Sequence, residues 1–292
     1  MINLQPAIPL RSGDAVATVA PSSALNDDQR LLEGLSILES WGLIALEQSV
    51  ADRRWGYLAG RDGERFSDLT QTAPLLACAR GGWGAARLLE RPVPWKPGWL
   101  LGFSDVTALL LARLAAGFAG GVHGPLLTTL ATEPEWSRER LRRLLFGEPL
   151  PQLSGEPRGR GKATGPLLVA NLTVASHLLG SPLMPDLRGA ILILEDVSEA
   201  PYRIDRMLTH WRLCGALQSL AGIGFGRFEA CDTPDADHTS FSLADVLQER
   251  TGDLDLPVVM DLPVGHVCGN AALPLGDLAC LDGDRGELSL VS

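Results

Sequence analysis

Short apolar runs alternate with helical segments through the first part of this sequence. Residues 15–20 form an apolar run, and a segment with leucines on one helical face follows it up to Trp41. Further apolar runs at residues 75–79 and 99–102 are again followed by segments with helical character. Because parallel strands need helical crossovers, this alternation predicts a mostly parallel sheet covered by helices on both faces. Ligands of such sheets bind at the carboxyl ends of the strands.

The stretch from Trp99 to Ala112 predicts a strand, a sharp turn with Ser104 at its apex, and an amphipathic helix. Such a turn holds its apical side chain close to the first free N–H groups of the helix. This position suits a nucleophile, because those N–H groups receive the negative charge that develops when a carbonyl is attacked. Alternatively, Ser104 or Asp105 merely caps the helix, and on this stretch alone the capping interpretation is favoured.

The second half of the chain differs from the first in composition and in the pattern of its apolar runs. Residues 147–165 are rich in Gly, Pro and Arg, which indicates a boundary between domains. We therefore expect an α/β domain at residues 1–148 with a doubly wound sheet of the Rossmann or flavodoxin type. We also expect a linker at residues 149–164 and a smaller, mostly β domain at residues 165–292.

Two residues of the second half are candidates for acid–base chemistry. Glu195 ends the apolar run 190–194, where a carboxylate is costly to bury without a partner. It caps a helix, forms a salt bridge with Arg203 or Arg206, or orients a catalytic histidine. His266 follows Gly265 and a short strand, which would present the imidazole ring at a strand end, although a structural role is the more common one for such a residue.

Composition and the missing motifs exclude several classes of function. The formal net charge of −10 argues against nucleic acid and anionic membranes as general partners. No HExxH motif or Cys/His cluster supports a metal site, and we expect no cofactor. The five cysteines include no CxxC pair, and no run is long enough for a signal peptide or a membrane span. We therefore expect a cytoplasmic protein.

Several short blocks, taken in their order along the chain, carry a more specific signal. They are Val19-Ala20-Pro21-Ser22-Ser23, residues 56–60 with Arg65, Arg80-Gly81-Gly82-Trp83-Gly84, residues 102–107, residues 122–125, residues 194–197 with 201–206, and Gly265-His266 with residues 273–276. Each block alone is weak, but the ordered set resembles the LD-carboxypeptidases, also called muramoyltetrapeptide carboxypeptidases. This family of serine peptidases also includes the microcin C immunity-type hydrolases.

The resemblance implies a Ser–His–Glu triad assembled from two domains. The family's nucleophile falls on Ser104, its acid on Glu195 and its histidine on His266. For the oxyanion we expect the backbone N–H of Asp105 and one N–H from Gly81 or Gly82, because glycines allow a close approach of the backbone.

The resemblance also implies a substrate, a cell-wall tetrapeptide that loses its terminal D-alanine in the cytoplasm during murein recycling. Its carboxylate needs a cationic partner, for which Arg80 and Arg203 are candidates, and Trp83 is a candidate for lining the pocket. Each of these three could instead be structural. The family also suggests a homodimer.

Two other functions remain open from the sequence. Trp83 stands where the family usually has tyrosine, and an aromatic ring there could stack on a base. This favours an immunity-type hydrolase that cleaves aminoacyl-nucleotide antibiotics and has the same fold and triad. A non-catalytic module that binds a small molecule is a further alternative, although it leaves the joint matches at Ser104, Glu195 and His266 unexplained.

Overall fold

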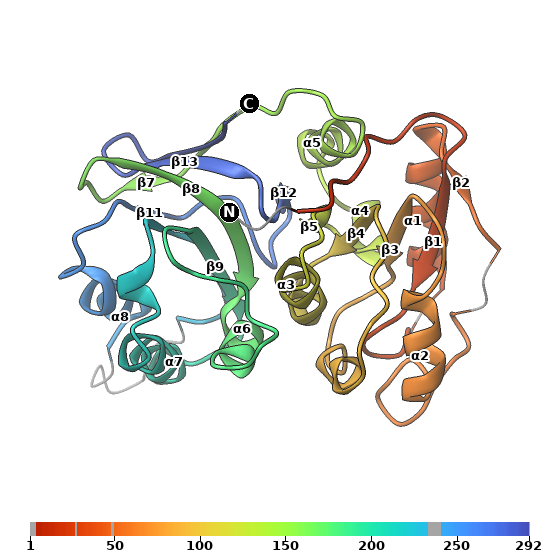
Figure 1. The fold of residues 1–292 in the computed structure, drawn as a ribbon, viewed down its shortest axis with the longest axis horizontal. Coiled ribbons are helices and arrows are strands. Elements are labelled where there is room, and N and C mark those ends of the chain that lie inside the picture. The colour runs from red at the N-terminus through yellow and green to blue at the C-terminus, as the bar shows by residue number, and fades with distance from the viewer. Residues whose placement is uncertain (1–3, 27, 48–49, 233–240, 292) are drawn as a thin grey trace. The chain divides into compact units, whose positions relative to one another are not determined.

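The computed structural model describes residues 4–26, 28–47, 50–232 and 241–291 of the chain. The chain divides into two compact units. The first unit comprises Met1–Leu150 and Cys268–Leu275, and the second comprises Pro151–Val267 and Gly276–Ser292. Each unit contains one sheet accompanied by helices (Figure 1).

The sheet of the first unit has the strand order β12-β5-β4-β3-β1-β2. Its strands are β1 (Ala15–Val19), β2 (Ile44–Ala45), β3 (Leu75–Cys78), β4 (Trp99–Gly102), β5 (Gly121–His123) and β12 (Leu273–Pro274). All neighbours are parallel except β12, which is antiparallel to β5. The order 2-1-3-4-5 is that of flavodoxin-like folds. The predicted α/β class with a mostly parallel sheet is therefore confirmed.

Helices and 3-10 turns accompany these strands. They are α1 (Gln29–Ser40), α2 (Asp62–Leu69), α3 (Thr107–Ala115), α4 (Leu127–Leu130) and α5 (Glu135–Leu145), with 3-10 turns η1 (Ala86–Glu90) and η2 (Ser104–Val106). Every residue of β3 and β4 is buried, and so are eight of the nine residues of α3. This continuous burial explains why these segments are apolar without alternation.

The sheet of the second unit has the order β6-β14-β13-β8-β9-β10-β11-β7. Its strands are β6 (Leu153–Ser154), β7 (Glu156–Pro157), β8 (Lys162–Asn171), β9 (Ile191–Val197), β10 (Gly222–Glu229), β11 (Val258–Met260), β13 (Leu278–Asp282) and β14 (Glu287–Leu290). The central strands from β8 to β11 are parallel, and the flanking pairs are antiparallel. The unit also contains helices α6 (Leu172–Leu178), α7 (Pro201–Leu213) and α8 (Leu243–Thr251) and the 3-10 turn η3 (Leu217–Ser219).

The expected linker at residues 149–164 differs from the structure. This segment supplies β6, β7 and the first residues of β8 to the second sheet. The reason is that β6 and β7 lie at the two edges of that sheet, where Gly and Pro are tolerated. A Cβ on Gly155 would lie 2.2 Å from the carbonyl oxygen of Met260, so the glycine that suggested a linker is required for strand packing.

The expected continuous domain at residues 165–292 is also interrupted. Residues 268–275 leave the second unit and add β12 to the first sheet, where Leu273 is in register with His123. The chain then returns at Gly276, whose N–H donates to the carbonyl of Leu167 in the second unit.

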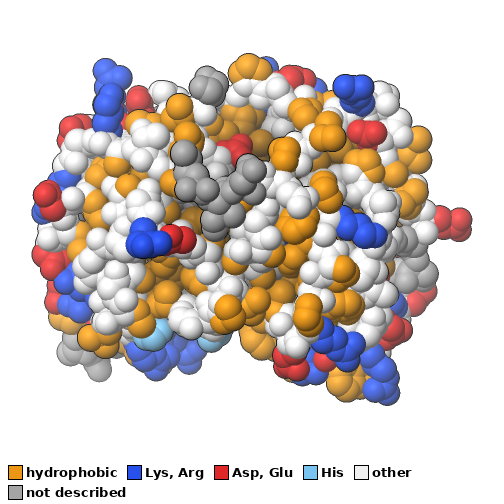
Figure 2. All heavy atoms as spheres, viewed as in Figure 1, with side chains coloured by type: hydrophobic (Ala, Val, Ile, Leu, Met, Phe, Trp, Pro, Cys, Tyr) orange, Lys and Arg blue, Asp and Glu red, His pale blue; other side chains and the backbone are white. Residues whose placement is uncertain are grey.

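Two surface properties bear on possible partners. None of the helices in the described part of the chain has the length and apolarity that a membrane crossing requires. On the face shown in Figure 2, acidic and basic side chains are interspersed rather than gathered into one patch.

Candidate active site

Ser104 occupies a strained position between strand β4 and helix α3. Phe103 is extended, with φ −149° and ψ −169°, and Ser104 then has φ 62°. A positive φ is uncommon for a residue other than glycine and stores about 1–3 kcal/mol of strain. Ser104 is half-buried and is the first residue of the 3-10 turn η2, which leads directly into α3. This is the strand–turn–helix geometry in which hydrolases expose a nucleophile.

The capping interpretation of this turn is wrong. Phe103 is the N-cap of η2 and Val106 is the N-cap of α3, so neither Ser104 nor Asp105 occupies a capping position. Instead, the buried carboxylate of Asp105 reaches another loop, where its Oδ2 accepts a 2.8 Å hydrogen bond from the N–H of Ala85. Burial raises the pKa of Asp105, and the hydrogen bond from Ala85 opposes this shift.

The loop that follows β3 passes directly beside Ser104. A Cβ on Gly81 would lie 2.9 Å from the Cβ of Ser104 and 3.0 Å from its Oγ. The same Cβ would lie 3.7 Å from the backbone nitrogen of Asp105. Gly82 has φ 108°, and a Cβ there would lie 2.3 Å from the Oγ of Ser23. Only glycines therefore allow this loop to approach Ser104 and Ser23 so closely.

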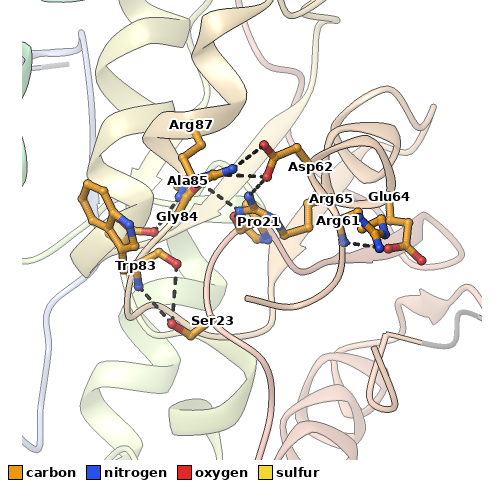
Figure 3. Close-up of polar contacts among 11 residues, drawn as sticks. Pro21, Ser23, Arg61, Asp62, Glu64, Arg65, Trp83, Gly84, Ala85 and Arg87 are labelled. Atoms are coloured by element: carbon orange, nitrogen blue, oxygen red, sulfur yellow. Dashed lines mark hydrogen bonds and ion pairs between the residues drawn. The ribbon is translucent and has the colours of Figure 1, made fainter. Parts of the chain in front are cut away.

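Arg80 and Trp83 belong to the same loop and also hold it in place. Arg80 is half-buried and donates a 2.8 Å hydrogen bond to the carbonyl of Ala24. The backbone N–H of Trp83 donates to the Oγ of Ser23 at 3.0 Å, as Figure 3 shows. The side chain of Trp83 is 41% exposed. Both residues therefore lie in the loop that contacts Ser104, and a role in substrate binding stays a prediction.

In the second unit, Glu195 and His266 form a pair. Glu195 lies in β9 with an exposed fraction of zero, and its Oε2 is 2.8 Å from Nδ1 of His266. The imidazole itself is accessible, with 19% of the side chain exposed. A carboxylate on Nδ1 fixes the ring orientation and favours the tautomer whose hydrogen is on Nδ1, so that Nε2 can accept a proton.

Two glycines make room for this pair. Gly265 has φ 128°, and a Cβ there would lie 3.0 Å from Oε2 of Glu195. A Cβ on Gly226 would lie 2.3 Å from the carbonyl oxygen of Val264 and 3.2 Å from the Cβ of Glu195. Strand β10 and the loop before His266 can therefore both approach the buried carboxylate.

The alternative partner of Glu195 is excluded by the observed contacts. Arg203 is exposed at the start of α7, where its Nη1 lies 3.4 Å from Glu199 and its Nε lies 3.2 Å from the hydroxyl of Tyr202. The salt-bridge interpretation of Glu195 with Arg203 is therefore wrong. A role of Arg203 toward the substrate remains a prediction.

The sequence analysis missed the polar residues that surround the end of β9. The buried Asp196 accepts hydrogen bonds from the side chain of Asn171 at 3.0 Å and from the backbone and hydroxyl of Thr173 at 2.9 and 2.7 Å. Asn171 also accepts from the N–H of Val174 and thereby caps α6. Burial raises the pKa of Asp196. In the sequence, the adjacent acids Glu195 and Asp196 at the end of an apolar run could have indicated a buried hydrogen-bond network there.

Comparison with known proteins places the chain in a family. The family model of the LD-carboxypeptidase N-terminal domain matches residues 16–124, and that of the LD-carboxypeptidase C-terminal domain matches residues 164–281. A protein from Synechocystis sp. that carries a carboxypeptidase name is 47% identical, over 99% of this chain and 97% of its own. The murein tetrapeptide carboxypeptidase of Pseudomonas aeruginosa is 33% identical, over 92% of this chain and 94% of its own.

Solved structures agree with this placement. The muramoyltetrapeptide carboxypeptidase from Oxalobacter formigenes is 27% identical with a TM-score of 0.83, and the match covers 94% of this chain and 97% of that one. MccF, solved in complex with glutamyl sulfamoyl guanosine, shares the fold with a TM-score of 0.86 at 21% identity, over 98% of both chains. The resemblance noted in the sequence is thus confirmed, and the chain belongs to the LD-carboxypeptidase family of peptidases.

Proposed function

We propose that this protein is a serine-type LD-carboxypeptidase that releases the terminal D-alanine from murein tetrapeptides in the cytoplasm. The observation that carries the proposal is the pair of Glu195 and His266, in which a wholly buried carboxylate lies 2.8 Å from the ring nitrogen of an accessible histidine. Such a pair activates a hydroxyl nucleophile. The strained turn at Ser104 supplies a serine of the required kind, and the names of the relatives supply the substrate class.

The mechanism follows from these side chains. His266 accepts the proton of the Ser104 hydroxyl as its oxygen attacks the scissile carbonyl, and later delivers that proton to the leaving amine. Glu195 stabilises the imidazolium that forms in between. Water then attacks the acyl-enzyme. His266 takes the proton of this water and delivers it to the Ser104 oxygen as the acyl C–O bond breaks, which releases the shortened peptide and regenerates the hydroxyl.

We assign the stabilisation of the negative charge on the carbonyl oxygen to backbone N–H donors. The N–H of Asp105 follows the serine at the start of η2, and Gly81 brings the neighbouring loop against Ser104. We assign the second donor to Gly81 or Gly82. Loss of one such donor raises the reaction barrier by about 3–4 kcal/mol.

The test is release of D-alanine from purified murein tetrapeptide. Ser104→Ala, Glu195→Ala and His266→Ala should each abolish nearly all release. His210→Ala, on the far part of α7, is the matched control and should keep the wild-type rate. Full activity of the Ser104→Ala variant, or no release by the wild-type protein, would contradict the proposal.

A second candidate reaction rests on one observation. Trp83 is 41% exposed in the loop that contacts Ser104, and an aromatic ring there could stack on a nucleobase. This favours cleavage of an aminoacyl sulfamoyl nucleotide, the ligand class seen with MccF. Comparing kcat/KM for tetrapeptide with kcat/KM for such a nucleotide decides between them. Trp83→Ala should lower only the value for the nucleotide if this second reaction is correct.

A further inference from the structure

Arg65 is a wholly buried arginine in helix α2, and no individual role for it follows from the sequence. Its guanidinium donates hydrogen bonds to the carbonyl oxygens of Pro21 and Gly84, and it forms an ion pair with Asp62 (Figure 3). Asp62 is in turn held by Arg87, whose Nη2 lies 2.9 Å from its Oδ2. One charged group thus joins the loop after β1 to the loop after β3.

The contact with Gly84 matters because the N–H of the same peptide group binds Asp105. The carbonyl of Gly84 accepts from Arg65 at 2.8 Å, and the N–H of Ala85 donates to Oδ2 of Asp105 at 2.8 Å. These two groups belong to one planar peptide unit, so bonds to both fix the orientation of its plane. Asp105 directly follows Ser104, and the same loop places Gly81 against Ser104.

The local packing leaves this peptide unit little freedom. Gly84 has φ 123°, and a Cβ there would lie 2.4 Å from the side chain of Leu58 and 2.9 Å from Nη1 of Arg65. The guanidinium therefore fills the space in which another residue would carry its side chain. A small displacement of the guanidinium would turn the peptide and shift the glycines that precede it.

We propose that Arg65 is a positioning residue that sets the backbone of the Arg80–Gly84 loop against Ser104, so that a glycine N–H of this loop can bind the oxyanion. The inference rests on the proposed function and deepens it. Arg65 acts through the Gly84–Ala85 peptide and not on the substrate. Lysine cannot replace it, because one ammonium group lacks the planar fork that spans two carbonyls and a carboxylate.

Arg113 offers a matched control in the same unit. It is also buried, and it donates to the carbonyls of Ala119 at 3.2 Å, Lys96 at 2.9 Å and Gly98 at 2.8 Å. These three residues lie outside the loop that contacts Ser104. Arg65→Lys and Arg113→Lys therefore remove comparable buried hydrogen bonds, and only the first affects the Gly84–Ala85 peptide.

The experiment measures three quantities on the full-length protein. These are thermal stability, the steady-state constants with tetrapeptide, and the rate at which a fluorophosphonate labels Ser104. We expect both variants to lose similar stability. Only Arg65→Lys should lower kcat and the labelling rate, by about tenfold to a hundredfold, with KM changed by less than about threefold.

The outcomes separate the two proposals. Wild-type labelling and kcat in a folded Arg65→Lys variant would overturn the positioning role, and so would an equal loss in Arg113→Lys. If Arg65→Lys does not fold, Asp62→Asn, which removes the charge partner of Arg65, should lower the labelling rate severalfold, and an unchanged rate would overturn the inference. Absence of D-alanine release by the wild-type protein would refute the proposed substrate, while the labelling rates would still test Arg65.

Discussion

The surroundings of Ser104 and those of Glu195 hold their residues in place by different means. Around Ser104 the important features are conformations of the backbone, namely a positive φ at the serine and a glycine loop packed against it. Around Glu195 the important feature is a side-chain pair, a buried carboxylate bound to His266. A backbone arrangement depends on space and strain, whereas a buried pair depends on charge and protonation.

The two regions also share a device. The residue after Ser104 and the residue after Glu195 are both buried aspartates that accept hydrogen bonds from another segment of the chain. Asp105 holds the loop at Ala85, and Asp196 holds the start of α6 at Thr173. In both regions, the residue that we propose to be catalytic is therefore followed by an aspartate whose side chain ties it to another segment of the chain.

The largest effect is expected from Glu195→Gln, which tests the dependence of the second region on charge. The amide keeps the size of the side chain, but it cannot stabilise an imidazolium and can hold the ring in the wrong tautomer. We expect kcat for D-alanine release to fall by about 10⁴-fold with folding intact. The exposed Glu249→Gln is the control, and an active Glu195→Gln variant would contradict a charge-dependent pair.

The next largest effect is expected from Gly81→Ala, which tests the dependence of the first region on space. Gly81 does not have a positive φ, so an alanine there is harmful only because its Cβ meets Ser104. We expect kcat to fall by about 10²- to 10³-fold, as for loss of an oxyanion donor. Gly63→Ala, where a Cβ would meet nothing within 4 Å, should keep the wild-type kcat.

A smaller effect, on stability, is expected from Gly226→Ala. Its Cβ would lie 2.3 Å from the carbonyl of Val264, which forces apart the strand that carries Gly226 and the loop before His266. We expect the free energy of unfolding in urea to fall by about 1–3 kcal/mol, as for an overpacked core. An unchanged urea midpoint would show that this loop yields easily and that close packing around Glu195 is not required.

The smallest effect is a change in pH dependence on Asp105→Asn. Burial raises the pKa of Asp105 in the folded chain, so the folded chain keeps a proton that the unfolded chain has already lost. The free energy of unfolding therefore contains a contribution that falls as the pH rises from about 3.9 through the raised pKa. The asparagine removes this contribution while its oxygen can still accept from Ala85.

Urea unfolding at several pH values measures this difference. The variant should lose less stability than the wild type between the ordinary and the raised pKa. Asp245→Asn, at the exposed start of α8, should change the profile in the opposite sense. The hydrogen bond from Ser242 lowers the pKa of Asp245, so the wild type loses this stabilisation as the pH falls and the Asp245→Asn variant does not. Identical profiles for Asp105→Asn and the wild type would show that Asp105 titrates alike in the folded and unfolded chains.

The central strands and the turn at Ser104 were predictable because their pattern is local. Apolar runs followed by amphipathic segments predict parallel strands and their crossovers, and the serine falls at the junction. The edge strands β6 and β7 were not predictable from Gly and Pro, because the same residues mark linkers. Strand β12 depends on pairing with β5, which lies far away in sequence.

The site was predictable only in part. Residue types left Glu195 with two kinds of possible partner, and the family resemblance selected His266, which is 71 positions away in sequence. The contact of Asp105 with Ala85 depends on how two loops fold together, so no local sequence pattern predicts it. Arg65 was overlooked as a buried residue because arginine is rarely buried completely.

Strand β12 has a practical consequence for anyone who wishes to divide this protein. A fragment that stops at Leu150 would contain the serine turn but would lack Leu273 and Pro274, and β5 would become a bare sheet edge. Unpaired strand edges recruit other chains, so such a fragment is expected to aggregate. The first unit would therefore need the eight residues 268–275 grafted back before it could be studied alone.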